Sequence, residues 1–245
     1  APETPAPELE RLAAALLAHP PVQAWLARLN PGAFPAALDA LSPATLRQFG
    51  NLVHSSQPEA LENVLGKLAE YGLRQEMPGV EERLQPLLKI FHWKPAWRSD
   101  VVFQNVWETL VKSVCAWGLL RLGCTPDTSL SDFILEHLDR CFWIARDQVY
   151  DLYASGSELD GLPKAWAGKP VMKQEVMAHY WLPYIHDLYL FAHLPPDFLD
   201  ASGEQKLEAL LAYILDPRFQ ALPNGYGYAW IKELRTCYGW GWSPH

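Results

Sequence analysis

Apolar side chains recur every three or four residues along most of the chain, and this spacing predicts amphipathic α-helices. Pro183 lies inside one such segment, residues 176–194, and should kink the helix there, because proline lacks the backbone N–H and clashes with the preceding turn. Pro195 and Pro196 then end the helix. Its apolar and aromatic stripe consists of Val176, Tyr180, Tyr184, Leu188 and Ala192.

A second amphipathic helix is predicted directly after this proline pair. Ser202 with Gln205 three residues later is a capping-box pattern, which marks a helix start. The helix should close at Asp216 and Pro217, because proline cannot continue it. Two helices joined by a short turn form a helical hairpin, and the apolar face of the second one holds Leu207, Leu210, Leu211 and Ile214.

The same periodicity predicts helices in most of the remaining chain, separated by turns that Gly and Pro mark. Gly72 is the expected C-cap of one of them, and residues 154–173 form a loop rich in Gly and Pro. Apolar and polar residues alternate at period two over no useful length, so no strand is predicted. The predicted fold class is therefore all-α, with further helices at residues 8–29, 42–53, 58–72, 80–91, 103–122 and 131–153.

A weak internal repeat links three segments, residues 64–88, 115–138 and 188–215. Each contains the end of an apolar helix, a tight turn and a second helix with leucines three and four positions apart. Helical hairpins with one apolar face must stack on their neighbours to bury it. We therefore expect stacked antiparallel helical hairpins, arranged as an α/α-toroid or an α-solenoid.

Length and composition fit a globular domain. The chain has 245 residues, of which 49% are hydrophobic, enough for a substantial core. Residues 1–7 are Pro-rich and are predicted to be a disordered lead-in. Residues 8–245 are predicted to form a single all-helical domain, with a sub-boundary near residues 92–100.

Charge and cysteine content exclude some classes of partner and favour one cellular compartment. The formal net charge is −8 and the chain has no basic run, which argues against a nucleic-acid partner. No apolar run reaches the roughly 20 residues of a membrane span. The 4 cysteines form no C-x-x-C pair, so we expect reduced thiols in a cytoplasmic protein. The first residues lack the basic and apolar regions of a signal peptide, although they could be what remains after one is removed.

Three histidines on the predicted 176–194 helix are candidates for chemistry. His179, His186 and His193 are seven residues apart, or about 10 Å along a helix, which is too far for any two to share a metal ion. We interpret His186 or His179 as an acid–base group, with Asp187 orienting the ring. The alternative is that these histidines are half-buried polar residues without a catalytic role. No metal ligand and no cofactor are assigned.

Aromatic residues suggest a binding surface. The segment 222–245 alternates glycines with aromatic residues, and it could form a lid or ligand wall, or else an arm packed on the last hairpin. The chain contains no G-x-S-x-G, H-E-x-x-H or phosphate-binding glycine motif. The predicted substrate-binding residues are Tyr180, Trp181, Tyr184, Tyr226, Tyr238 and Trp240.

The hairpin pattern from about residue 58 to residue 220, with its long loop and aromatic tail, resembles the α/α-toroid group of terpene cyclases and protein prenyltransferase β subunits. This resemblance implies an aromatic-lined cavity that holds an isoprenoid, since aromatic faces attract a cation by about 0.5–2 kcal/mol. The alternative is that these aromatic residues belong to an ordinary core. The D-x-D-D, Q-x3-G-x-W and D-D-x-x-D motifs are absent. The cavity walls implied by the resemblance include Trp107, Trp117, Trp143 and Tyr189.

The same resemblance implies a zinc site made of an Asp-x-Cys pair and a distant histidine. The chain contains Asp139 and Cys141, with His179 and His186 downstream. Residues i and i+2 of a helix point about 200° apart, so such a pair serves only at a helix end, and here it is predicted in mid-helix.

Two functions remain as expectations. The first is the binding of a small apolar or aromatic molecule in an aromatic-lined cleft, as a lyase or transferase of isoprenoid-like substrates. The second is a non-catalytic helical-repeat scaffold whose exposed aromatic stripe binds a protein partner. Fold analogy alone does not decide between them.

Overall fold

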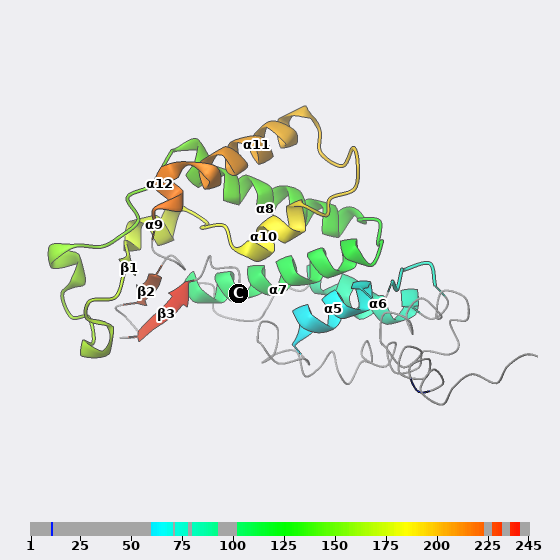
Figure 1. The fold of residues 1–245 in the computed structure, drawn as a ribbon, viewed down its shortest axis with the longest axis horizontal. Helices are drawn as coiled ribbons and strands as arrows, with labels where there is room; N and C mark the ends of the chain where they lie inside the picture. Colours follow the sequence, from blue (N-terminus) through cyan, green and yellow to red (C-terminus); the bar gives the residue numbers. More distant parts are fainter. Residues whose placement is uncertain are drawn as a thin grey trace, which may run out of the picture. The chain divides into compact units, whose positions relative to one another are not determined.

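Helices make up most of the structure, which is a computed structural model (Figure 1). It describes residues 11, 60–70, 72–77, 80–92, 102–222, 227–231 and 236–240. The chain divides into two compact units: unit 1 comprises residues 1–95 and 110–127, and unit 2 comprises residues 96–109 and 128–245. The prediction of a helical fold is confirmed at this level. None of the described helices combines the length and the apolar character that a membrane span needs.

Several predictions fall on residues that the structure does not describe. The disordered lead-in at residues 1–7 and the predicted helix at 42–53 lie outside the described residues. The predicted helix at 8–29 lies outside them too, apart from residue 11, and so does most of the predicted sub-boundary at 92–100. These predictions stand as made, and so does the prediction of a single domain.

Unit 1 contains a helical hairpin whose turn was predicted from a glycine. Helix α5 (Leu61–Glu70) is followed by α6 (Val80–Leu88), a short 3₁₀ helix (Lys89–His92) and the later part of α7 (Val102–Arg121). Gly72 has a positive φ of 79°, and the Leu73 amide donates to the Leu68 carbonyl at 3.1 Å, which closes the end of α5. Side chains that are at most 3% exposed form the core of this unit: Leu61, Leu65, Leu68, Leu84, Leu87 and Leu119.

Unit 2 is built on the packing of α8 (Thr128–Arg146) against α11 (Ala201–Leu215), which lie side by side in Figure 1. The buried side of α8 follows the spacing of three and four residues that the sequence predicts. Polar contacts also join this region to α11: Lys206 pairs with Asp139 at 2.5 Å, and the Tyr213 hydroxyl donates to the Val149 carbonyl at 2.5 Å. Helix α8 begins and ends earlier than the predicted 131–153.

The start of α11 differs from the prediction. The N-cap is Asp200, whose carboxylate accepts from the Gly203 amide at 2.8 Å, and Ser202 lies inside the first turn. An aspartate is as good an N-cap as a serine and also adds a negative charge at the helix N-terminus, so the earlier position is favoured. The predicted end at Asp216 is confirmed, and Asp216 then caps a short helix, α12 (Pro217–Gln220).

The predicted kinked helix at 176–194 is two helices. Helix α9 (Gln174–His179) and helix α10 (Ile185–Phe191) are separated by an extended connector, residues 180–184. Pro183 explains the break, because it cannot donate a backbone hydrogen bond and it disfavours a helical conformation in the residue before it. The break places a new helix N-terminus at Tyr184, and this matters for the site below.

The prediction that the chain has no strand is wrong for a small part of unit 2. Strand β1 (Val171–Met172) pairs in parallel with β2 (Gly227–Ile231), which pairs antiparallel with β3 (Thr236–Trp240). In the register, Tyr228 faces Gly239 and Ala229 faces Tyr238. The alternation of glycine and aromatic residues in this tail is itself a period-two pattern, and glycines had led us to expect a loop or arm.

Candidate metal centre

His137 and Cys141 lie one turn apart on α8 and are fully inside unit 2. Their exposed fractions are 1% and 0%. Residues four positions apart share a helix face, so both side chains leave α8 in the same direction as its buried apolar stripe. A histidine and a cysteine are thus held on one rigid element at the spacing that metal-binding helices use.

Asp187 comes from α10, and the start of that helix fixes its orientation. It lies in the first turn and is 1% exposed. Its Oδ2 atom accepts from the Tyr184 amide and from the Trp181 indole Nε1, each at 2.8 Å, and more weakly from the Cys141 thiol at 4.0 Å. A carboxylate near a helix N-terminus is also favoured by the helix dipole. Asp187 is therefore held as a carboxylate with one oxygen already occupied.

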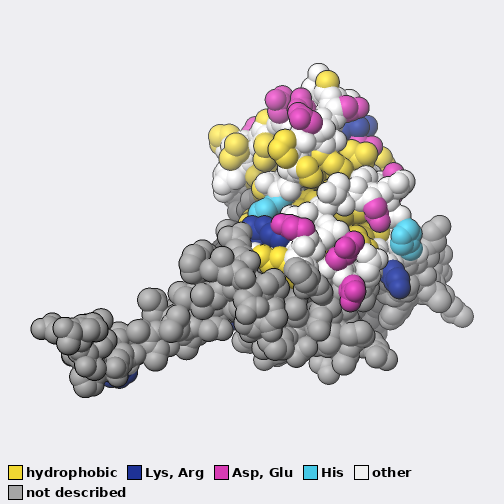
Figure 2. Space-filling view, turned by 90° about the vertical axis from the view of Figure 1, so that its right-hand side faces the viewer, with side chains coloured by type: hydrophobic (Ala, Val, Ile, Leu, Met, Phe, Trp, Pro, Cys, Tyr) yellow, Lys and Arg dark blue, Asp and Glu magenta, His cyan; other side chains and the backbone are white. Residues whose placement is uncertain are grey.

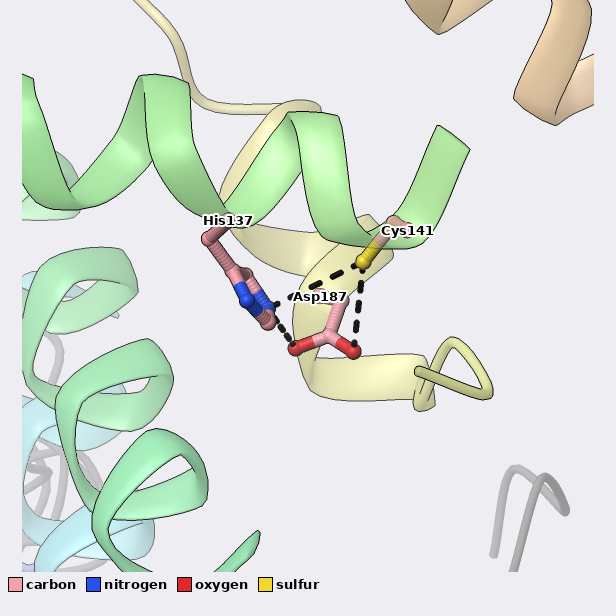
Figure 3. Close-up of side chains that lie close together, drawn as sticks. All are labelled: His137, Cys141 and Asp187. Atoms are coloured by element: carbon pink, nitrogen blue, oxygen red, sulfur yellow. Dashed lines mark hydrogen bonds and ion pairs between the residues drawn. The ribbon is translucent and has the colours of Figure 1, made fainter. Parts of the chain in front are cut away.

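The three side chains converge, as Figure 3 shows. His137 Nε2 lies 2.8 Å from Asp187 Oδ1. Cys141 Sγ lies 3.9 Å from the same nitrogen and 4.0 Å from Asp187 Oδ2. One ligand atom from each residue lies within 4.8 Å of the other two. A nitrogen, a sulfur and an oxygen donor thus meet at one buried point.

The pKa is lowered for the Asp187 carboxyl and raised for the Cys141 thiol. Burial raises the pKa of the Asp187 carboxyl, but the His137 ring and the hydrogen bonds from Trp181 and Tyr184 lower it further, so the net direction is downward. Burial raises the pKa of the Cys141 thiol well above its usual value, the charge of Asp187 adds to this, and the Arg140 guanidinium opposes it. Without a cation in the site, Cys141 stays a neutral thiol and is a poor nucleophile.

Aromatic rings surround the convergence point. Phe133 stacks on the His137 ring with centroids 5.4 Å apart, and Trp181 meets the same ring edge-on at 5.4 Å. The Phe191 ring lies 6.0 Å from His137. Apolar walls lower the local dielectric constant, which strengthens the attraction between charged groups inside them.

The donor set suits a zinc-type ion. Zn²⁺ binds histidine nitrogen, cysteine thiolate and carboxylate oxygen, and two ligand atoms on one tetrahedral ion lie roughly 3.3–3.8 Å apart. The 2.8 Å between His137 Nε2 and Asp187 Oδ1 is below this range and the 3.9 Å between Nε2 and Cys141 Sγ is just above it, so these side chains would have to shift to seat an ion. A bound cation would also deprotonate Cys141. Three protein ligands leave one coordination position open, as in catalytic zinc sites.

The predicted catalytic residues are only partly brought together. Asp187 is in the centre, and the ring that lies against its carboxylate is that of His137. His186 is buried at 5% exposure, and its ring meets Tyr189 edge-on at 6.4 Å. His179 is exposed at the end of α9, with its Nδ1 atom 2.7 Å from the Glu175 carbonyl. The catalytic roles assigned to these residues stay predictions.

The predicted substrate-binding residues also separate. Trp181 and Tyr184 lie beside the centre, whereas the Tyr180 hydroxyl donates to Asp147 at 3.0 Å in an exposed contact. Tyr226 lies outside the described residues. The structure describes the backbone of the other two, Tyr238 and Trp240, within β3, and not their side chains.

The implied pair of Asp139 and Cys141 does not form a common site. Cys141 is fully buried beside His137, while the side chain of Asp139 is 48% exposed and pairs with Lys206. This is the outcome that the 200° separation of i and i+2 residues predicts. Cys141 thus lies beside His137 and Asp187, and Asp139 lies apart from them.

Sequence reasoning missed His137, although a signal was available. His137 and Cys141 form an H-x3-C pair with i, i+4 spacing inside an apolar stripe. A polar pair at buried positions of a helix is unusual enough to mark a site, because buried polar groups need partners. The three histidines predicted as candidates, His179, His186 and His193, belong to a different segment, residues 176–194.

Comparisons with known proteins add no family. No family model matches the chain, and no similar protein was found among the curated proteins or among the solved structures. Function is therefore inferred from the geometry of the centre formed by His137, Cys141 and Asp187.

Proposed function

We propose that unit 2 binds one transition-metal ion, Zn²⁺ by preference, through His137, Cys141 and Asp187. One observation supports this most strongly: a nitrogen, a sulfur and an oxygen donor from two helices lie within 4.8 Å of one another in a fully buried site. Soft thiolate and imidazole donors favour zinc over magnesium or calcium, which prefer oxygen ligands.

A metal explains the composition of the site better than an isolated ion pair does. The His137–Asp187 contact alone would be a buried pair that ties α8 to α10. It gives the Cys141 thiol only a weak hydrogen bond to Asp187 Oδ2 at 4.0 Å, beside a carboxylate whose negative charge opposes ionisation of the sulfur. A divalent cation between the three groups turns this unfavourable neighbourhood into a favourable one.

The proposed role of the ion depends on the coordination position that the three protein ligands leave open. With three protein ligands, Zn²⁺ can polarise a bound water or the polar group of a substrate. The sequence suggests a small apolar or aromatic molecule as the ligand, and the rings of Phe133, Trp181 and Phe191, which pack on His137, make the surroundings of the centre apolar. The proposed activity is a metal-dependent reaction on such a molecule, as in a lyase or transferase, in which His137, Cys141 and Asp187 would anchor the ion.

The predictions on architecture, compartment and partners are compatible with this proposal. Stacked helical hairpins, closed as a toroid or open as a solenoid, would provide the frame for the centre. The thiol ligand suits a reducing compartment such as the cytoplasm. The net charge of −8 continues to argue against nucleic acid as a partner.

A second candidate function, the binding of a protein partner, is favoured by exposed apolar side chains on α8 and α11. Leu135 and Trp143 on α8 are 43% and 46% exposed, and Leu211 and Leu215 on α11 are 42% and 72% exposed. Figure 2 shows apolar side chains on one face of the molecule, with carboxylates among them. Such exposure is typical of surfaces that other proteins cover.

Metal analysis tests the proposed function. The full chain is stripped with a chelator, dialysed against Zn²⁺ and analysed by mass spectrometry for zinc per chain. We expect one tightly bound zinc in the wild type, and background levels in His137→Ala and Cys141→Ser. Matched controls are Cys115→Ser, a buried cysteine of unit 1, and His193→Ala, an exposed histidine, and both should retain the ion.

Two results would reject the metal function. The first is a wild-type chain that retains no more zinc than His137→Ala. The second is Cys141→Ser and His137→Ala chains that retain zinc like the controls, which would move the ion to another site. Circular dichroism of each variant ensures that loss of zinc is compared between folded chains.

A further inference from the structure

The two oxygens of Asp187 have different surroundings. Oδ2 accepts from the Trp181 indole and from the Tyr184 amide, each at 2.8 Å, while Oδ1 faces His137 Nε2 at 2.8 Å. A carboxylate oxygen has about two lone-pair positions. The two N–H donors therefore use the capacity of Oδ2 and leave Oδ1 for an ion.

This asymmetry has a consequence for metal coordination. A carboxylate with one available oxygen binds an ion through that oxygen alone. Zn²⁺ accepts such a ligand in a four-coordinate tetrahedral site, whereas ions that prefer oxygen ligands and six or more of them, such as Mn²⁺ and Ca²⁺, gain from carboxylates that bind through both oxygens. The hydrogen bonds on Oδ2 thus disfavour ions that need six or more ligand atoms.

Of the two N–H donors, only Trp181 is a side chain, and the third donor, the Cys141 thiol, is a proposed ligand. Its indole is 5% exposed and is held from its face by the Arg140 guanidinium, 5.0 Å from the ring centroid. Arg140 in turn donates from Nη1 to the Thr109 hydroxyl at 3.3 Å. The chain of contacts from Thr109 through Arg140 fixes the indole plane and so the direction of its N–H.

We propose that the Trp181 indole N–H holds Asp187 in one-oxygen coordination and thereby adds to the preference for Zn²⁺ over Mn²⁺ that the thiolate and imidazole ligands give. Trp181 acts through Asp187 and is a positioning residue. This inference rests on the proposed metal function. Trp181, which does not itself bind the ion, would thus contribute to the selectivity of the site for Zn²⁺ over Mn²⁺.

The test replaces the N–H and keeps the ring. Trp181→Phe is compared with wild type and with Trp143→Phe, the same substitution at an exposed position of α8. Competition titrations give the affinities for Zn²⁺ and Mn²⁺, and the visible spectrum of the Co²⁺-loaded chain reports the coordination number. Site-specific incorporation of 3-benzothienylalanine at position 181 removes the N–H with almost no change of shape, and it serves if Trp181→Phe does not fold.

We expect Trp181→Phe to lose about 10–100-fold in Zn²⁺ affinity, the usual cost of removing a group that orients a ligand. The ratio of Mn²⁺ to Zn²⁺ affinity should rise, and the Co²⁺ absorption should weaken as the ion leaves four-coordination. Trp143→Phe should match wild type in all three readouts. The benzothienyl analogue should behave as Trp181→Phe does.

The failures of the two proposals are distinguishable. If wild type binds neither Zn²⁺ nor Co²⁺, the metal function itself is rejected. If wild type binds Zn²⁺ but the variants weaken both ions equally, with an unchanged Co²⁺ spectrum, then Trp181 only supports the fold and the selectivity inference is overturned.

Discussion

At the scale of the residue, Asp187 shows which part of a site a local sequence pattern can predict. Its predicted task was to orient a histidine, and in the structure its carboxylate lies 2.8 Å from a histidine ring. That ring belongs to His137, 50 positions earlier in the chain and on another helix. Spacing along one helix predicts which residues share its face. Which face of α8 meets α10 is decided by packing between helices, and no local pattern contains it.

Close approach of helices can be tested at single glycines in unit 1. A Cβ added at Gly118 of α7 would lie 2.5 Å from Leu65 Cδ1 and 2.8 Å from Leu65 Cβ on α5. Leu65 Cβ is tied to the backbone and cannot move aside. We expect Gly118→Ala to lower the free energy of unfolding by about 1–3 kcal/mol, the usual cost of overpacking a core. Urea unfolding measures this change.

Gly66→Ala on α5 is the matched control. Its added Cβ would meet Arg121 Nη1 at 3.5 Å and Trp117 Cη2 at 3.7 Å, which are ordinary contacts. Alanine favours a helix by up to about 1 kcal/mol over glycine, so Gly66→Ala should be neutral or stabilising. Equal stability of the Gly118 and Gly66 variants would mean that α5 and α7 do not approach as closely as described.

At the scale of the element, the break between α9 and α10 makes the centre. A continuous helix over 176–194 would place Trp181 and Asp187 on different faces, about 120° apart around the axis, since six residues turn through about 600°. The extended connector of residues 180–184 lets the Trp181 indole reach the first turn of α10 instead. The sequence marked this position through Pro183, but a proline inside an apolar pattern predicts a kink as readily as a break.

Zinc binding should stabilise the packing of α8 against α10. At a free zinc concentration 100 times the Kd, the bound ion stabilises the folded state by about 2.7 kcal/mol. Hydrogen–deuterium exchange should therefore slow in peptides from Thr128–Arg146 and Ile185–Phe191 when zinc is added. Peptides from α5 (Leu61–Glu70) in unit 1 should be unchanged. Slower exchange in α5 alone, or no change anywhere, is the result that this account does not allow.

The small sheet shows that hydrophobic periodicity does not predict very short strands. Strand β1 has 2 residues and β2 and β3 have 5 each, so each offers at most a few alternations. Glycines between aromatic residues read as a loop when hydrophobicity is counted, because glycine is neither clearly apolar nor polar. Pairing of Val171 with Tyr228 joins segments far apart in sequence, and no local signal predicts it.

At the scale of the whole molecule, helix dominance was predictable and the site was not. The period of three to four residues is repeated over most helices, so local errors at their ends average out. The centre instead needs three residues of two helices to meet, and one of them, His137, was passed over. Buried polar residues carry this information: His137, Cys141 and Asp187 are all at most 1% exposed in unit 2.

The most direct test of the central claim is X-ray absorption spectroscopy at the zinc edge of the zinc-loaded full chain. The account predicts one sulfur at about 2.3 Å from zinc, together with nitrogen and oxygen ligands at about 2.0–2.2 Å. The sulfur should disappear in Cys141→Ser. A wild-type spectrum with nitrogen and oxygen ligands alone would contradict a centre formed by His137, Cys141 and Asp187.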